Sequence, residues 1–117
     1  MQTKKNIEIR PWGFFEILFE SKDCKIKKIE VNPGERLSYQ YHKKRSETWI
    51  IIQGNAKITL DEKENIFKKG DTLIIPKGTK HRVQNNNNEA LVFIEVQTGE
   101  YFGEDDIVRI NDDYGRK

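Results

Sequence analysis

Cysteine is almost absent from this chain, which limits how the fold can be stabilised. The 117 residues include one cysteine, Cys24, so an internal disulfide is excluded. No apolar run approaches the roughly 18 residues that a membrane-spanning helix needs. The segment Met1 to Arg10 also lacks the apolar stretch of an export signal. We therefore expect a cytoplasmic protein that does not contact a membrane.

An excess of charge of one sign is also lacking. The chain has 21 Lys and Arg against 19 Asp and Glu, a formal net charge of +2. The two signs are interspersed, which favours solubility and gives no reason to expect binding to nucleic acid. Domains typically contain about 100 to 200 residues, so this length leaves room for one. We expect a single domain over residues 1–117, with its core at about 10–110.

Good helix formers are scarce as well. The chain has 2 Ala and 5 Leu against 15 Ile, a balance that favours strands over helices. Between recurrent turn residues the sequence predicts short strands over residues 14–19, 25–31, 36–42, 47–53, 56–60, 64–67, 72–75, 80–84 and 90–97. This pattern predicts an all-β sandwich or barrel. We expect residues 1–8 and the last few residues to be frayed.

Polar and apolar side chains alternate over residues 36–42. One face carries Arg36, Ser38, Gln40 and His42, and the other carries Leu37, Tyr39 and Tyr41. The polar face either meets water, with the apolar face in the core, or lines the interior of the fold. In the second case the apolar face is an outer stripe, and we expect a homodimer interface to cover it.

The only two histidines lie far apart in the sequence, in similar surroundings. Gln40 and His42 are two residues apart on a predicted strand and point the same way, and Glu47 begins the next strand. These three side chains can converge on one point. His81, from a separate hairpin, would complete four N and O donors of the kind that hold a divalent first-row metal. Alternatively, both histidines are ordinary hydrogen-bonded residues.

The spacing around these donors extends to the neighbouring turns. One run joins Pro33-Gly34, Gln40, His42, Glu47 and Gly54, and a second joins Gly70, Pro76, Gly78, His81 and Asn85. In order and spacing the two runs resemble the two motifs of the cupin superfamily, with Gln40 where many members carry the first histidine. The resemblance implies an all-β cupin fold, the double-stranded β-helix or jelly-roll barrel.

A closer resemblance covers about residues 10–116. It is carried by Arg10-Pro11-Trp12-Gly13, by Leu37-Ser38-x-Gln40-x-His42-x-x-Arg45-x-Glu47-x-Trp49, by Ile94-Glu95-Val96-Gln97-x-Gly99-x-Tyr101-x-Gly103-Glu104-Asp105-Asp106-Ile107-x-Arg109 and by Tyr114-Gly115-Arg116. These residues resemble the C-terminal isomerase domain of type II mannose-6-phosphate isomerases. In that family the domain usually follows a mannose-1-phosphate guanylyltransferase, whose Gly-rich start is not found here. We expect a free-standing isomerase domain of polysaccharide biosynthesis, with a separate guanylyltransferase as a possible partner.

The resemblance implies interconversion of mannose 6-phosphate and fructose 6-phosphate through an enediolate. This reaction needs an electrophile at the substrate oxygens and a base above the carbon plane. The donors Gln40, His42, Glu47 and His81 carry one negative charge, so a divalent ion would keep net positive charge and polarise the carbonyl. Family likeness favours zinc, and Mn, Fe, Co and Ni stay open.

Two residues are candidates for the base. Lys27 shares the parity of Ile29, and Glu95 shares that of Phe93 and Gln97. Either side chain points into the interior if those faces are the inner ones. The alternative is that Lys27 and Glu95 are a solvated or paired couple on the surface.

The substrate phosphate calls for cations at the mouth of the site. Arginine offers a planar fork that suits phosphate, and Arg36 and Arg45 are our first choices, with Arg109 as a third. Arg45 is also counted among the catalytic candidates because it lies between two metal donors. Arg109 could instead tie the C-terminal tail to a nearby carboxylate. Ser38 and Gln97, which share faces with the candidates above, are expected to contact substrate.

Two other functions fit the same residues. The chain could be a non-catalytic sugar-phosphate-binding cupin that acts with a separate nucleotidyltransferase. It could also be an isomerase or epimerase of another phosphosugar. Oxygen-dependent cupin chemistry is disfavoured, because such iron sites usually have a second histidine where Gln40 stands.

Overall fold

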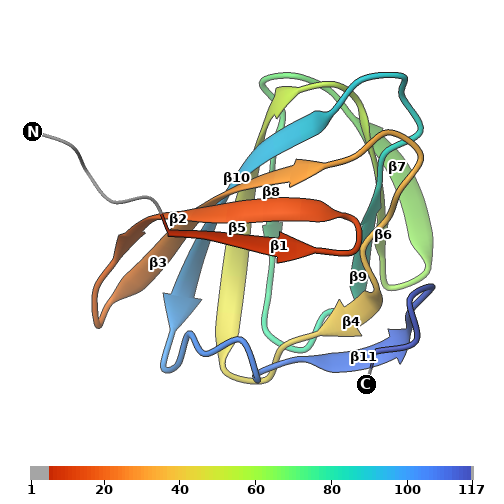
Figure 1. Cartoon of the computed structure of the whole chain (residues 1–117). Helices are drawn as coiled ribbons and strands as arrows, with labels where there is room; N and C mark the ends of the chain where they lie inside the picture. Colours follow the sequence, from red (N-terminus) through yellow and green to blue (C-terminus); the bar gives the residue numbers. More distant parts are fainter. Residues whose placement is uncertain (1–5, 117) are drawn as a thin grey trace, which may run out of the picture.

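The computed structural model describes residues 6–116, which form strands joined by turns and loops (Figure 1). The strands are β1 (Asn6–Arg10), β2 (Gly13–Glu20), β3 (Cys24–Val31), β4 (Tyr39–Tyr41), β5 (Arg45–Gln53), β6 (Ala56–Leu60), β7 (Lys63–Phe67), β8 (Thr72–Ile75), β9 (His81–Gln84), β10 (Leu91–Gly99) and β11 (Val108–Asn111). Within residues 6–116 there is no helix, and hence none long and apolar enough to cross a bilayer. The all-β prediction is confirmed.

The strands form two antiparallel sheets. One sheet has six strands in the order β1-β2-β3-β10-β5-β8, and the other has five in the order β11-β4-β9-β6-β7. Strands far apart in sequence lie side by side, since β10 pairs with both β3 and β5 (Figure 1). β4 and β9 are also neighbours, and this pairing brings residue 40 opposite residue 81. The topology therefore gathers side chains from both halves of the chain.

The inner face of the six-stranded sheet changes from apolar to polar along its central strands. Successive inward cross-strand pairs of β10 and β3 are Leu91 with Val31, Phe93 with Ile29, Glu95 with Lys27 and Gln97 with Lys25. β5 changes in the same way, through buried Ile51, Trp49, Glu47 and Arg45. Buried polar groups are costly unless they are paired, so such a concentration points to a site. The polar end lies toward the bottom of Figure 1.

The hydrophobic core fills the other end of the space between the sheets. Ile51, Leu91 and Phe93 have no exposed surface there, and Trp49 packs on Phe93 with ring centroids 4.5 Å apart. Burying a side chain of this size stabilises the fold by about 1.5–3 kcal/mol. The core therefore provides a rigid base on which the polar end is built.

Two strands and two ends differ from the sequence prediction. β1 and β11 were not predicted, and the expectation that residues 6–8 are frayed is wrong because Asn6 to Arg10 pair with β2. Residues 112–116 are also held in place, since Asp112 accepts three hydrogen bonds from Arg116. The fraying expected for residues 1–5 lies outside the described residues.

The predicted strand 36–42 is broken in its middle. Residues 37 and 38 are not in a strand, and only Tyr39–Tyr41 forms β4. The break places Leu37 in the core, 8% exposed, so the apolar stripe expected along Leu37, Tyr39 and Tyr41 does not form. Tyr39 and Tyr41 are half-buried. The homodimer stays a prediction, but this argument for it is lost.

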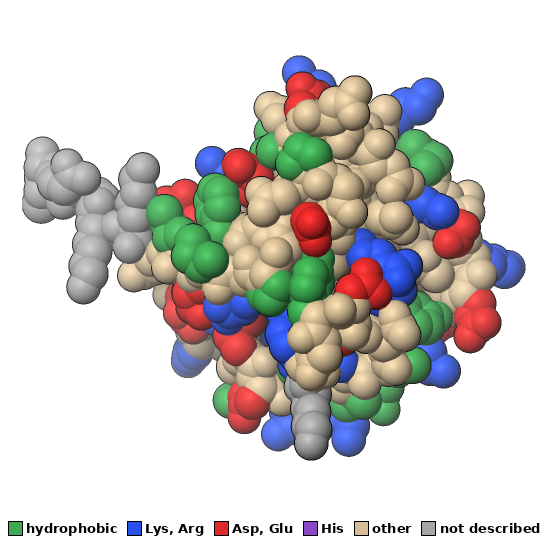
Figure 2. All heavy atoms as spheres, turned by 45° about the vertical axis from the view of Figure 1, so that its right-hand side comes forward, with side chains coloured by type: hydrophobic (Ala, Val, Ile, Leu, Met, Phe, Trp, Pro, Cys, Tyr) green, Lys and Arg blue, Asp and Glu red, His purple; other side chains and the backbone are tan. Residues whose placement is uncertain are grey.

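The surface is charged and mixed in sign. Figure 2 shows Lys and Arg side chains interspersed with Asp and Glu over the face drawn, as the sequence indicates. The exposed large hydrophobic residues include Ile7, Ile9, Leu18 and Phe19, which all belong to β1 and β2. These residues are the principal apolar feature of the N-terminal strands.

Candidate metal centre

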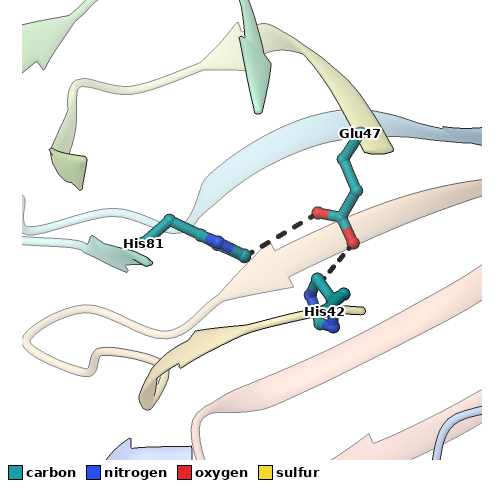
Figure 3. Close-up of side chains that lie close together, drawn as sticks. All are labelled: His42, Glu47 and His81. Carbon is teal, nitrogen blue, oxygen red and sulfur yellow. Dashed lines mark ion pairs between the residues drawn. The ribbon is translucent and has the colours of Figure 1, made fainter. Parts of the chain in front are cut away.

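Two histidines and one glutamate converge at the polar end of the interior. His42 follows β4, Glu47 lies in β5 and His81 begins β9. One ligating atom from each residue can be chosen so that all three lie within 4.8 Å of one another. Figure 3 shows both imidazole rings beside the Glu47 carboxylate. The structure thus brings His42, Glu47 and His81 together, as the sequence spacing predicts, and their role as metal ligands stays a prediction.

Hydrogen bonds to the backbone fix how the two imidazole rings are oriented. His42 Nδ1 lies 2.7 Å from the carbonyl oxygen of Asp106, and His81 Nδ1 lies 2.9 Å from that of Thr79. A carbonyl oxygen can only accept, so each Nδ1 carries the proton. In the neutral ring each Nε2 then presents a lone pair, the arrangement that metal-bound histidines typically show.

The surroundings of His42 favour its neutral form. Burial lowers the pKa of His42 to about 4, and the positive charge of Arg45 acts in the same direction. His42 Nε2 lies 3.2 Å from Glu47 Oε2. A neutral imidazole this close to a carboxylate oxygen is suited to share a cation with it.

Both oxygens of Glu47 are held by neighbours on β5. Trp49 Nε1 donates to Oε1 at 2.9 Å, and Arg45 Nε donates to Oε2 at 2.8 Å. Burial acts to raise the pKa of Glu47, but the charge of Arg45 opposes it and the net pKa is lowered. Glu47 is therefore a fixed, ionised carboxylate inside the fold.

Two buried polar atoms beside this cluster have no hydrogen-bond partner within residues 6–116. They are His81 Nε2 and Gln40 Oε1, and Gln40 is the cross-strand partner of His81. Both atoms carry lone pairs, and leaving a buried acceptor unsatisfied is costly. A divalent cation would satisfy both of them together with Glu47. The residues present thus fit a metal held by Gln40, His42, Glu47 and His81.

A cavity extends from these donors toward the base candidates. Its lining includes Ser38, Arg45, Lys27 and Glu95. Burial raises the pKa of Glu95 to about 7, the charge of Glu47 adds to this, and the charges of Lys27 and Arg45 oppose it. The expectation that both base candidates point inward is confirmed, because Lys27 is 3% and Glu95 5% exposed.

Gln97 and Arg45 support other side chains of the site. Gln97 Nε2 donates to Glu95 Oε2 at 2.6 Å, and Gln97 is buried behind the cavity wall. Arg45 is 6% exposed and its Nε is occupied by Glu47. Ser38 and Arg109 line the cavity as expected, and their contact with substrate stays a prediction.

Arg36 does not share the face of Gln40 and His42, so that expectation is wrong. Its guanidinium makes two hydrogen bonds to Asp113, from Nε at 2.6 Å and from Nη2 at 2.8 Å. It lines a separate depression with Arg82 and Gln84, outside the cavity. The irregular backbone at residues 37 and 38 ends the alternation on which the prediction depended.

Sequence reasoning missed two residues that support the site. Lys25 is buried, and its Nζ donates to the carbonyl oxygen of Phe102 at 3.2 Å and to Glu104 at 3.0 Å. Glu104 also pairs with Lys27 Nζ at 2.7 Å. The parity of Lys25 with Lys27 could have indicated the first residue. Glu104 belongs to a motif that carries the family resemblance, but no strand alternation indicated its role, because it lies in the loop between β10 and β11.

Comparison with known proteins identifies relatives of this chain. A family model described as mannose-6-phosphate isomerase C-terminal matches residues 1–112. A mannose-1-phosphate guanylyltransferase of Salmonella montevideo is 45% identical over 107 residues, 92% of this chain and 23% of that protein. The alginate biosynthesis protein AlgA of Pseudomonas aeruginosa is 40% identical over 116 residues, 98% and 24% of the two chains. This chain therefore spans about a quarter of the length of these curated relatives.

Solved structures share the fold at low sequence identity. The capsular polysaccharide assembling protein CapF from Staphylococcus aureus has a TM-score of 0.83 at 17% identity, over 94% of this chain and 35% of that chain. A Klebsiella pneumoniae protein with a double-stranded β-helix domain has a TM-score of 0.72 at 22% identity, over 82% and 77%. The predicted cupin fold is thereby confirmed. From its family match and its close relatives, the chain belongs to the mannose-6-phosphate isomerase C-terminal family.

Proposed function

We propose that this chain is a metal-dependent aldose-ketose isomerase that interconverts mannose 6-phosphate and fructose 6-phosphate. Family membership supports the reaction class. The observation that carries the proposal is the cluster of His42, Glu47 and His81, whose ligating atoms lie within 4.8 Å of one another. Two of these residues, His42 and Glu47, line the same cavity as Glu95. This arrangement supports the proposal, because a metal ion bound there and the Glu95 carboxyl group would both face one cavity.

The donor set suits a divalent ion of the first transition row. Two imidazole nitrogens, a carboxylate and the Gln40 amide oxygen are the donors that zinc accepts, and Mn, Fe, Co and Ni accept them as well. When bound, such an ion would polarise the carbonyl oxygen of an open-chain sugar and stabilise the negative charge of the enediolate. We take zinc as the first choice.

The chain's own residues would move the proton between C1 and C2. Glu95 lines the cavity, and Gln97 Nε2 donates to one of its oxygens at 2.6 Å. The carboxylate would take the proton from one carbon and return it to the next. Lys27 is ion-paired with Glu104 and so has no lone pair for this task, but its ammonium can donate to a substrate oxygen.

A coupled assay on the zinc-loaded protein tests the proposal. We expect conversion of mannose 6-phosphate to fructose 6-phosphate well above the rate of a variant that carries both His42→Ala and His81→Ala. Glu95→Gln should bind zinc normally and lose at least about 100-fold in turnover, the lower range for general-base catalysis. Turnover that does not exceed that of the double variant would contradict the proposal.

A binding protein without turnover is the competing proposal. It is favoured by one observation, that the relatives quoted are named as a guanylyltransferase and an alginate biosynthesis protein rather than as isomerases. Such a protein would act with a separate nucleotidyltransferase in polysaccharide biosynthesis. Calorimetry that shows tight binding of fructose 6-phosphate, together with no turnover of any phosphosugar tested, would support it. Turnover of a different phosphosugar would change only the proposed substrate.

A further inference from the structure

Positively charged side chains exceed carboxylates in the lining of the cavity. The cationic lining residues are Arg10, Lys27, Arg45, Arg109 and Arg116, and the acidic ones are Glu47, Glu95 and Glu104. Two of the carboxylates already pair with lining cations, Glu47 with Arg45 and Glu104 with Lys27. The lining then still holds Glu95 against three arginines, Arg10, Arg109 and Arg116, so positive charge is in excess there.

These three arginines come from separate segments and line one cavity. Arg10 ends β1, Arg109 lies in β11 and Arg116 lies in the tail. Arg109 is the cross-strand partner of Gln40, so the two side chains project from the same face of the sheet. Arg109 is thus placed directly beside the metal donors.

Arg10 reaches the cavity from the opposite sheet. Its guanidinium carbon lies 4.9 Å from the centroid of the Phe15 ring, and Lys27 Nζ lies 3.9 Å from the same centroid. One aromatic ring thus holds Arg10 near a base candidate. The carboxylate that pairs with Arg10 is Glu8, at 2.9 Å, and Glu8 does not line the cavity.

Arg116 is fixed in position by a carboxylate outside the lining. Asp112 accepts from the backbone nitrogen, Nε and Nη2 of Arg116, at 2.7, 2.9 and 2.8 Å. The Asp112 side chain is 4% exposed, so it is a buried anchor. An arginine held in this way loses little further freedom when it binds an anion.

The electrostatics agree with the geometry. Burial lowers the pKa of Arg109, and the charges of Arg116 and Arg10 lower it further. Like charges gathered around one cavity repel one another, and a dianion bound among them would relieve that repulsion. A phosphate monoester carries about two negative charges at neutral pH and accepts hydrogen bonds from arginine in bidentate fashion.

We propose that Arg10, Arg109 and Arg116 form the subsite that binds the phosphate group of the sugar phosphate. The inference depends on the proposed function for the identity of the ligand, a phosphate monoester on the carbon chain of a hexose. It replaces the role that the sequence suggested for Arg36. The sugar's reacting carbons would then lie at the metal donors, and its phosphate at the end bounded by β1, β11 and the tail.

Calorimetry on the zinc-loaded protein tests this subsite without turnover. The probes are fructose 6-phosphate and inorganic phosphate, and the variants are Arg10→Gln and Arg116→Gln. The matched control is Arg36→Gln, which removes the same charge from an arginine outside the cavity. We expect each cavity variant to weaken the Kd of fructose 6-phosphate at least about tenfold, as loss of a charge-assisted hydrogen bond does, and the control to stay within about twofold.

Each outcome has a defined meaning. Cavity variants that bind fructose 6-phosphate within twofold of the wild type, or an Arg36→Gln variant that loses as much as they do, would overturn the subsite. Absence of detectable binding of both probes to the wild type would overturn it too. If Arg116→Gln fails to fold, Arg10→Gln decides, because Arg10 lies on a different segment. A wild type that binds phosphate through these arginines but turns over no sugar would refute the isomerase and leave the subsite standing.

Discussion

At the scale of the residue, the metal donors depend on neighbours that hold them. Glu47 is fixed by Trp49 and Arg45, and the two histidines are fixed by backbone carbonyl oxygens. Such outer contacts orient the donor atoms before any ion arrives. The supporting residues should therefore affect metal affinity nearly as much as the donors do.

Trp49→Phe tests this dependence. The change removes the Nε1 donor to Glu47 Oε1 and keeps most of the aromatic volume. We expect zinc affinity to fall about 10-fold to 100-fold, measured by competition with a chromophoric chelator. Trp12→Phe makes the same change at the other buried tryptophan and is expected to leave zinc affinity within threefold. Equal zinc affinities of Trp49→Phe and the wild type would contradict this role.

The alternation of inward and outward side chains along the strands predicted part of the site and gave a wrong position for Arg36. It placed Lys27 and Glu95 inside because β3 and β10 alternate without interruption. It failed for Arg36 because residues 37 and 38 leave the strand, which no residue type in that segment announces. Glu104 could not be predicted, since its position depends on contacts with two lysines nearly eighty residues away.

At the scale of the element, the loop between β10 and β11 is tied to the site at several points. Glu104 pairs with both Lys25 and Lys27, and Asp106 accepts from the backbone nitrogens of Lys43 and Lys44 at 3.0 and 2.9 Å. The carbonyl of Asp106 also orients His42. The loop is thus part of the site's framework.

Glu104→Gln tests the contribution of this loop through its pH dependence. Burial acts to raise the pKa of Glu104, but Lys27 and Lys25 outweigh it and lower the pKa to about 2. A lowered pKa in the folded state stabilises the protein above the ordinary value near 4.5, and this stability is lost as pH falls toward 2. The side chain is 36% exposed, so screening by solvent leaves about 1 kcal/mol of effect.

Urea unfolding at pH 7 and at pH 3 measures this effect. We expect the free energy of unfolding to drop between the two pH values by about 1 kcal/mol more in the wild type than in Glu104→Gln. Glu64→Gln is the matched control, because it breaks an exposed pair with Lys57. An equal drop in the wild type and Glu104→Gln would show that the ion pairs of Glu104 do not stabilise the fold.

The turn between β1 and β2 is a second element on which the structure depends. Gly13 has φ of +151°, and a Cβ there would lie 2.1 Å from the carbonyl oxygen of Glu30 on β3. We expect Gly13→Ala to lower the free energy of unfolding by about 2–4 kcal/mol, because backbone must move. Gly70→Ala, where an added Cβ meets nothing within 4 Å, should cost about 1 kcal/mol. Similar urea midpoints for the two variants would contradict this prediction.

The sequence predicted most of the strands but not the strands at two sheet edges. β1 and β11 are edge strands, and each pairs on one side only. No residue of either strand is fully buried, and charged residues such as Glu8 and Arg109 mask the strands in the sequence. Central strands such as β5 and β10 carry the clear pattern because both sides are paired and one face is buried.

At the scale of the whole molecule, the homodimer stays a prediction. The exposed side chains of Ile7, Ile9, Leu18 and Phe19 on β1 and β2 are the surface on which we now base it. Light scattering should give a dimer mass for the wild type and a monomer mass for Ile9→Glu. Ile74→Glu, at a 68% exposed position on β8, should stay dimeric. A wild-type monomer mass would contradict the prediction.

The whole fold also explains why the site could be located from sequence. His42 and His81 lie together because β4 pairs with β9. Two motifs that are far apart in the sequence therefore contribute to one site. The rings lie with centroids 5.0 Å apart. The spacing could not predict that Arg10, Arg109 and Arg116 line one cavity, because this depends on how β1, β11 and the C-terminal tail lie relative to one another.

The most direct test of the account is anomalous diffraction at the zinc edge from crystals soaked with zinc and fructose 6-phosphate. We expect one strong peak among Glu47 and the Nε2 atoms of His42 and His81, with the sugar's C1 and C2 oxygens beside it. A zinc peak at any other place, or a sugar phosphate bound away from these residues, would contradict the central claim.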